Sequence, residues 1–305
     1  MLRFLITLSF LWCMAHAPAQ EQLLTDSTVT FVRNWKKGEK ALFLMTRVKA
    51  KIEDGVRKVT DSLRSFVEIS VLQTTGEQHI MQWKYIPEKT MPVSKDPAIN
   101  FLQHASIKYS ILQTGEFIEL VNWKELKDAM NSVINGFLKE KNSQDARLSA
   151  EIKKIFSSKE NLETVLTKET QLYHTLYGGE FTLHQQIKTP TLLPNILGGD
   201  PFPSILTAEL TGIDSINQTC SVLVTQEFDP EKVSEVLANW AKKFAKTPDF
   251  KVPAMAITDR IDIIADLKTG WMKQVTNLRT VVVEDVTATE IVTIKQAHTV
   301  TAGVK

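Results

Sequence analysis

Hydrophobic and polar residues alternate along most of the chain beyond residue 26. Met81, Trp83 and Tyr85 would share one face of a strand, and Gln82 and Lys84 would share the other. This period of two is typical of strands with one buried face. It predicts strands at 27–35, 40–53, 57–74, 78–86, 105–113, 116–121, 180–188, 204–213, 217–227, 254–267, 271–285 and 288–297. Long antiparallel strands twist, so we expect a strongly curved sheet.

Short polar segments that contain glycine separate the early strands. They carry Gly38, Gly55, Gly76 and Gly115. Glycine reaches the positive φ that tight hairpin turns require, and Asp54 before Gly55 gives the strongest turn signal of the four. These strands are therefore expected to pair as antiparallel neighbours.

Three segments change to the spacing of amphipathic helices. The first begins after Asn122, which together with Glu125 predicts a capping box. The second covers 146–176, and a fresh cap at Ser157 predicts a break within it. The third begins after Asp229, which is followed by a proline suited to the first helical turn.

These elements predict an α+β fold, with a long, curved antiparallel β-sheet packed against amphipathic helices. We expect an N-terminal sheet plus helix at 20–145, a helical bridge at 146–178 and a C-terminal sheet plus helix at 179–305, forming one compact unit. A hairpin followed by a helix occurs at 105–121 and again at 204–227. This recurrence fits either two pseudo-repeated halves from a duplication or two uses of a common motif.

The first 19 residues predict a cleaved export signal. Arg3 provides the positive end, Phe4–Met14 the apolar core, and Ala17 and Ala19 the small residues before Gln20. An apolar run of this length is too short to span a bilayer, which requires about 20 residues. We expect secretion across the inner membrane to the periplasm or cell surface, with no stable membrane span left after cleavage.

The two cysteines refine this expectation. Cys13 follows Trp12, a bulky residue where lipid attachment needs a small one, so no lipid anchor is expected. Cys220 then remains alone and cannot form an internal disulfide. Its apolar neighbours predict a buried, inert thiol. A single cysteine suits a bacterial periplasm better than a disulfide-rich secreted domain.

The composition is that of a globular protein. Of 305 residues, 43% are hydrophobic and 23% charged, and the formal net charge is +1. This balance gives no electrostatic reason to expect a nucleic-acid partner.

No motif predicts catalysis, a metal site or a cofactor, so we expect a protein that is not an enzyme. The histidines lack the spacing of zinc ligands. Asp259, Asp262 and Asp266 crowd one strand, but the last two fall on its polar face. Asp259 interrupts the apolar face, which indicates a bulge or opening nearby.

Residues 189–204 combine four prolines with several large apolar side chains. The prolines exclude a central strand, so this segment is expected to be an apolar loop. Such a loop either plugs one end of the sheet or forms a flap for an apolar ligand or a partner. Its candidate binding residues are Leu192, Leu193, Ile196, Leu197 and Phe202.

Three motifs resemble those of a group of uncharacterised bacterial secreted proteins. They are QTGEFIELVNWKEL at 113–126, LYGG at 176–179 and KTGW at 268–271. The resemblance covers most of the mature chain and implies no catalytic residues. In outline, the order of strands and helices is also similar to periplasmic lipoprotein-carrier folds, an analogy of architecture alone.

Three functions are compatible with these features. The first is a binding module that holds an apolar or lipid-like small molecule between the sheet and its helices. The second is an envelope protein with a filled core that binds another protein. The third is an unrecognised hydrolase, which would require titratable groups gathered in a cleft.

Overall fold

Eleven antiparallel strands form one long sheet in the computed structural model, which describes residues 27–31, 35–86, 101, 105–139, 158–193, 201–244 and 254–298. The strand order is β6-β5-β4-β3-β2-β13-β12-β11-β10-β9-β8. The strands are β2 (Lys40–Glu53), β3 (Val56–Thr74), β4 (Gln78–Ile86), β5 (Ser106–Leu112), β6 (Phe117–Leu120), β8 (Gln186–Leu193), β9 (Phe202–Asp214), β10 (Thr219–Phe228), β11 (Met255–Asp266), β12 (Met272–Val283) and β13 (Val286–His298). A separate two-stranded sheet pairs β1 (Thr28–Thr30) with β7 (Glu180–Thr182).

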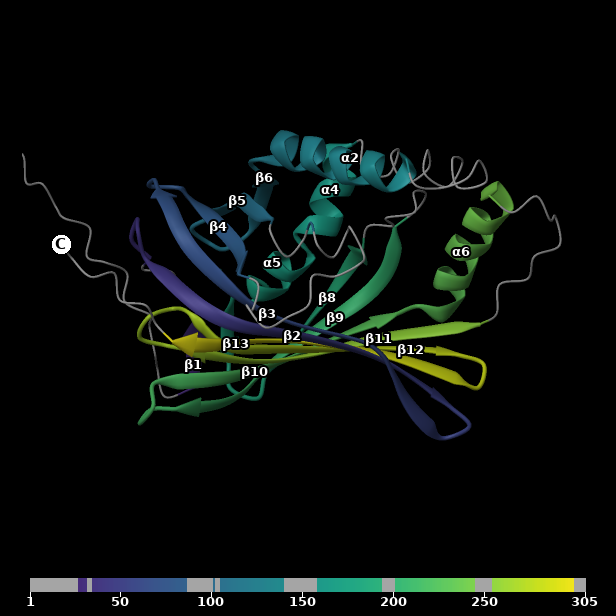
Figure 1. The fold of residues 1–305 in the computed structure, drawn as a ribbon. Coiled ribbons are helices and arrows are strands. Elements are labelled where there is room, and N and C mark those ends of the chain that lie inside the picture. Colours follow the sequence, from purple (N-terminus) through teal and green to yellow (C-terminus); the bar gives the residue numbers. More distant parts are fainter. Residues whose placement is uncertain are drawn as a thin grey trace, which may run out of the picture.

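The helices are few. They are α2 (Trp123–Lys139), α4 (Lys159–Leu166), α5 (Lys168–Tyr173) and α6 (Pro230–Phe244). The sheet is strongly curved, and α4, α5 and α6 lie on its concave side (Figure 1). The protein is therefore mostly antiparallel β-sheet, and the predicted α+β class describes it only loosely. No helix in the described part of the chain is long and apolar enough to cross a membrane.

Consecutive strands pair as hairpins, and the first long strand closes against the last. β2 pairs with β13, so segments from both ends of the chain meet in the middle of the sheet. Turns hold the hairpins in register. Asp54 and Gly55, both at positive φ, join β2 to β3, as the sequence predicted.

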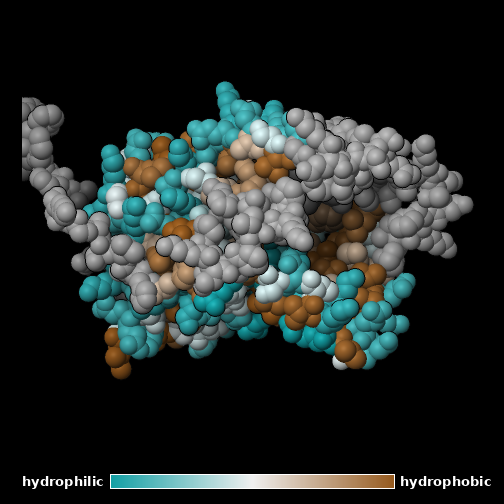
Figure 2. Space-filling model, in the orientation of Figure 1, coloured by the Kyte–Doolittle hydropathy of each residue, from teal (hydrophilic) through white to brown (hydrophobic). Residues whose placement is uncertain are grey.

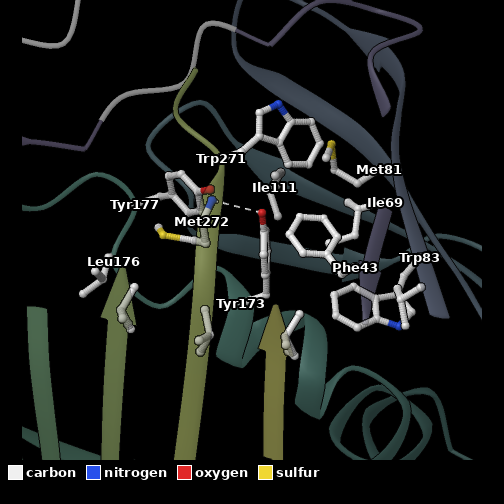
Figure 3. Packing of buried hydrophobic residues seen from close by; sticks show 14 of the residues in the cluster. Phe43, Ile69, Met81, Trp83, Ile111, Tyr173, Leu176, Tyr177, Trp271 and Met272 are labelled. Carbon is white, nitrogen blue, oxygen red and sulfur yellow. Dashed lines mark hydrogen bonds between the residues drawn. The ribbon is translucent and has the colours of Figure 1, made fainter. Parts of the chain in front are cut away.

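The main core lies on the concave face, defined here as the sheet face toward α4 and α5. Figure 3 shows the aromatic side chains that fill it. The Tyr173 hydroxyl accepts a hydrogen bond from the backbone N–H of Met272 at 3.1 Å. Trp271 stacks on Trp35 with ring centroids 4.5 Å apart. Helix α5 is thereby held against the β11–β12 turn.

Cys220 faces this core on β10 and is buried, as predicted. Burial raises the pKa of its thiol to about 12. The thiol therefore stays protonated and unreactive at physiological pH.

Several local predictions need correction. The predicted strand 180–188 is two strands, because His184 adopts a φ of 60° between β7 and β8. The expected loop 189–204 is partly strand: β8 runs to Leu193 and β9 begins at Phe202. Pro190 is tolerated because β8 is an edge strand, where a missing N–H breaks no ladder.

The helix starts differ in detail. Ser158 caps α4 by accepting a hydrogen bond from the Asn161 N–H at 3.1 Å, one residue later than predicted. Helix α2 begins where expected, but Asn122 forms no capping box. Its amide oxygen accepts from the Lys108 N–H at 2.8 Å, which fastens the helix start to β5. Asp229 caps α6 as predicted, accepting from the Glu231 N–H at 3.0 Å.

Candidate functional site

The concave face has a filled half and a more open half. Near α5, the inward positions are fully buried apolar residues such as Phe43, Val275 and Ile294. Farther along the same strands, the inward positions become polar and charged. They become apolar again beyond that row, where Ile257 and Val281 are only partly buried.

We call the polar row the polar band. It consists of Thr191, Ser204, Gln226, Asp259, Arg279, Glu290, Arg47, Lys168 and Glu169. Strand register places its central members side by side, because Gln226 pairs with Asp259 and Arg279 pairs with both Asp259 and Glu290. The band crosses the sheet from the edge strand β8 to β2 and reaches α5.

Asp259 and Arg279 form the centre of the band. The Arg279 guanidinium donates two hydrogen bonds to the Asp259 carboxylate, at 2.8 and 2.6 Å. This bidentate contact raises the pKa of Arg279. The Asp259 side chain is 4% exposed and the Arg279 side chain 26%. The ion pair explains why an aspartate interrupts the apolar face, and the β11 bulge lies at Ile264 rather than beside it.

Glu290 forms the second charged centre. Lys168 Nζ lies 3.2 Å and Arg47 Nε 3.5 Å from its carboxylate. Burial alone would raise the pKa of Glu290, but Lys168 and Arg47 together lower it. Arg47 also donates a hydrogen bond to Glu169 on α5. Burial alone would lower the pKa of Arg47, but attraction to these glutamates raises it.

The other end of the band is uncharged. Gln226 Nε2 donates hydrogen bonds to Ser204 Oγ at 2.8 Å and to Thr191 Oγ1 at 3.2 Å. The two hydroxyl oxygens lie 2.8 Å apart. This end therefore offers hydroxyl groups and the charged end offers paired ions, a mixture suited to a polar headgroup.

Apolar residues continue beyond the band, beneath α6. We call this surface the apolar trough. It consists of Phe228, Val233, Val236, Ile257 and Val281. Helix α6 lies against β9 and β11, with Val233 and Val236 buried toward the sheet. Figure 2 shows apolar side chains gathered in a hollow on the right of the molecule, where Figure 1 places α6 and β9.

The structure places the ligand-binding residues predicted from the sequence on different faces of the sheet. Leu193 and Phe202 are paired between β8 and β9. They lie on the same face of the sheet as Thr191 and Ser204 and are partly buried. Leu192 points to the opposite, convex face and is 67% exposed. Ile196 and Leu197 lie outside the described residues, as does the predicted export signal at 1–19.

The other carboxylates of β11 have structural partners. Asp262 pairs with Arg260 on the outer face, at 2.8 Å. Asp266 accepts hydrogen bonds from the N–H groups of Lys268 and Thr269, at 3.0 and 2.9 Å, and so shapes the turn to β12. Among the described residues, no three His, Cys, Asp or Glu side chains are grouped so that they could hold a metal ion.

Two pockets lie away from the polar band. One, of about 450 Å³, lies at the start of α2, where the amide of Gln82 donates to Ser106 Oγ at 2.6 Å. The other, of about 400 Å³, lies beside the end of α5, where the ring of His174 lies 2.8 Å from the Tyr109 hydroxyl.

No family model and no curated protein matches this chain. This agrees with the resemblance noted from the sequence, which carries no characterised activity. Among solved structures, a lipovitellin chain, from a study of lipid–protein interactions, is 9% identical with a TM-score of 0.41. The match covers 89% of this chain and 26% of the lipovitellin chain, so this chain spans about a quarter of that length. Ail, the attachment invasion locus protein of Yersinia pestis, is 7% identical with a TM-score of 0.16, and the match covers 85% of this chain and 97% of Ail.

Proposed function

We propose that this protein is a non-enzymatic binding module, secreted to the periplasm or cell surface, that holds an amphipathic, lipid-like small molecule on the concave face of its sheet. The apolar part of the ligand would lie in the apolar trough, and its headgroup would contact the polar band. No catalytic or cofactor chemistry is needed for this function.

The observation that carries the proposal is the order of side chains along the concave face. A sheet face that only closes a core is expected to be apolar throughout, because even paired charged groups are costly to bury and often stabilise a fold no more than apolar packing does. Here a polar row is followed by partly buried apolar residues. An amphipathic ligand matches this order, since its chain removes apolar surface from water while its headgroup replaces water at the polar groups.

The test is binding of a fluorescent fatty acid to the chain that starts at Gln20, combined with native mass spectrometry of protein from its own compartment. Ile257→Glu places a charge in the apolar trough and should abolish probe binding. Ile264→Glu is the matched control, because Ile264 lies on the same strand but faces outward and is 38% exposed. Equal binding by both variants, or none by the unaltered chain, would contradict the proposal.

A second candidate function rests on the convex side of the sheet edge. Leu192 is 67% and Ile205 54% exposed, and strand register places Pro203 opposite Leu192 and Pro190 opposite Ile205. An exposed apolar cluster of this kind suits a protein partner in the envelope. Leu192→Ser with Ile205→Ser should then abolish partner recovery in a pull-down without changing probe binding. Unchanged recovery would count against this function.

A further inference from the structure

The pocket beside the end of α5 is built from sequence motifs that the proposed function does not use. Residues 114–117 of the first motif and 177–178 of the LYGG motif line it, together with Gln171, His174 and Thr175. Its volume of about 400 Å³ lies within the range of small-molecule sites, about 300–1,000 Å³. It shares no lining residue with the polar band or the apolar trough.

Contacts between the motifs fix the shape of this pocket. The backbone of Gly178 packs on Thr114 so closely that no Cβ would fit between them. The Tyr177 hydroxyl donates a hydrogen bond to the Gly270 carbonyl at 2.8 Å, which ties the KTGW turn to the same place. Three turns that lie far apart in the sequence therefore hold the pocket together.

Three aromatic rings contribute to the lining. Phe117 is half-buried, and His174 and Tyr177 are buried. The ring centroids of His174 and Tyr177 lie 5.4 Å apart. Tyr109 connects this pair to Phe117, because its ring lies 5.5 Å from that of His174 and 6.2 Å from that of Phe117. The faces of phenylalanine and tyrosine rings are electron-rich and attract cations.

The polar side chains at the end of α5 offer mainly acceptors. Thr175 Oγ1 donates its only hydrogen toward the carbonyl oxygens of Gln171 and Leu172, at 3.1 and 2.9 Å, so this oxygen can only accept from a ligand. The Gln171 amide nitrogen donates to Thr167 Oγ1 at 2.8 Å, and its amide oxygen remains as an acceptor. Gln171 and Thr175 are four residues apart, so they lie on one side of the chain.

Glu116 gives the pocket a negative charge. It is exposed, and none of the ion pairs between described residues involves it. None of the described lining residues is Lys or Arg. A carboxylate, acceptor oxygens and aromatic faces together favour a ligand that is positively charged and donates hydrogen bonds. A primary ammonium group meets both conditions, since it has three N–H donors and no acceptor.

We propose that this pocket binds a small organic cation, in which a primary ammonium group is attached to a short apolar body. The ammonium group donates to the Glu116 carboxylate, and the apolar body lies against the rings of Phe117 and Tyr177. A neutral alcohol of the same shape lacks the charge, and a carboxylate is repelled by Glu116. The inference does not depend on the proposed lipid-like ligand, because the two sites share no residue.

The test is isothermal titration calorimetry of the chain starting at Gln20 with phenethylammonium and butylammonium, compared with 2-phenylethanol and 3-phenylpropionate. At pH 8 primary amines keep their charge and histidine is ordinarily neutral. Phenethylammonium should bind at least about tenfold more tightly than 2-phenylethanol, because hydrogen bonds to charged groups are the stronger ones. The anion 3-phenylpropionate should not bind.

Variants assign the binding to the pocket. Glu116→Gln should weaken phenethylammonium binding by about tenfold. Glu77→Gln is the matched control, because Glu77 is exposed and accepts at its backbone carbonyl from the Gln113 N–H, but it does not line the pocket. It should change binding by less than about twofold. Phe117→Leu should weaken binding by about threefold or more, and Phe117→Tyr, which keeps the ring, should not.

Crossed measurements separate this proposal from the proposed function. Ile257→Glu should leave phenethylammonium binding unchanged, and Glu116→Gln should leave fatty-acid binding unchanged. Circular dichroism should show each variant folded. Equal affinity for phenethylammonium and 2-phenylethanol, no binding of either amine, or equal effects of Glu116→Gln and Glu77→Gln would overturn the proposal. Tighter binding of Nα-acetyl-lysine amide than of both free amines would point to a lysine of a partner protein and would overturn the small-molecule assignment.

Discussion

The ion pair at the centre of the polar band allows a sharp test of whether the band stabilises the fold. Asp259→Leu would leave the Arg279 guanidinium without its carboxylate, and Arg279→Met would leave the Asp259 carboxylate without its cation. Removing one partner of a fully buried pair costs about 3–5 kcal/mol. Because the Arg279 side chain is 26% exposed, water can partly solvate it, and we expect each single substitution to cost about 2–3 kcal/mol.

The double variant, Asp259→Leu with Arg279→Met, should behave differently. Replacing both charges with apolar groups of similar size leaves no unpaired ion, so its stability should lie within about 1 kcal/mol of the unaltered chain. Urea unfolding of all four proteins gives the coupling energy directly, provided that the m-values agree. A double variant that costs the sum of the two single substitutions would refute this reasoning. A stable double variant that binds the fatty-acid probe less tightly would assign the pair to ligand recognition.

Three further predictions concern stability and reactivity. Gly178→Ala should lower the free energy of unfolding by at least about 2 kcal/mol. The backbone of Gly178 has a φ of +79°, and the new Cβ would lie 2.1 Å from the Thr114 carbonyl oxygen. In a parallel urea titration, Gly76→Ala should change the free energy of unfolding by less than about 0.5 kcal/mol, because the new Cβ meets open space. The folded protein lowers the pKa of Glu290 below its ordinary value of 4.5. Its ion pairs therefore stabilise the fold at pH values above 4.5, and this stabilisation is lost as the pH falls through the folded pKa. The melting temperature of Glu290→Gln should thus fall less between pH 6 and pH 3 than that of the unaltered chain, and parallel curves would contradict this. Cys220 should not react with a thiol reagent at pH 8 until urea unfolds the protein, and rapid reaction of the native chain would show that the thiol is accessible.

The strands could be predicted from the sequence because each has one buried and one exposed face. The predicted bounds of 40–53 and 78–86 agree with β2 and β4. The division between β7 and β8 could not be predicted, because alternation continues across it and histidine rarely takes the positive φ found at His184. The extent of β8 was missed because its proline was taken to exclude a strand. Proline excludes a central strand but not an edge strand, and position at an edge depends on pairing across the whole sheet.

The polar band was largely invisible in the sequence. Its members come from seven strands and one helix, and Arg47 pairs with both Glu169 and Glu290, which lie far from it in the chain. Only Asp259 gave a signal, because it broke the apolar parity of its strand. Arg279 breaks the parity of β12 in the same way, and the two positions are opposite in the register. Matching such interruptions between neighbouring strands could have found the pair.

The polar band also constrains how the two halves of the concave face can function. The filled half needs no ligand, since α5 and its aromatic neighbours already exclude water from it. Beyond the band, α6 covers the sheet from one side only, and Ile257 and Val281 keep part of their surface in water. Extending the core over these residues would require burying the ion pairs completely, which is costly. The proposed amphipathic ligand would cover the apolar residues, while its headgroup would let the charged groups keep polar neighbours. The same charges that oppose a larger core therefore favour a ligand with one polar end.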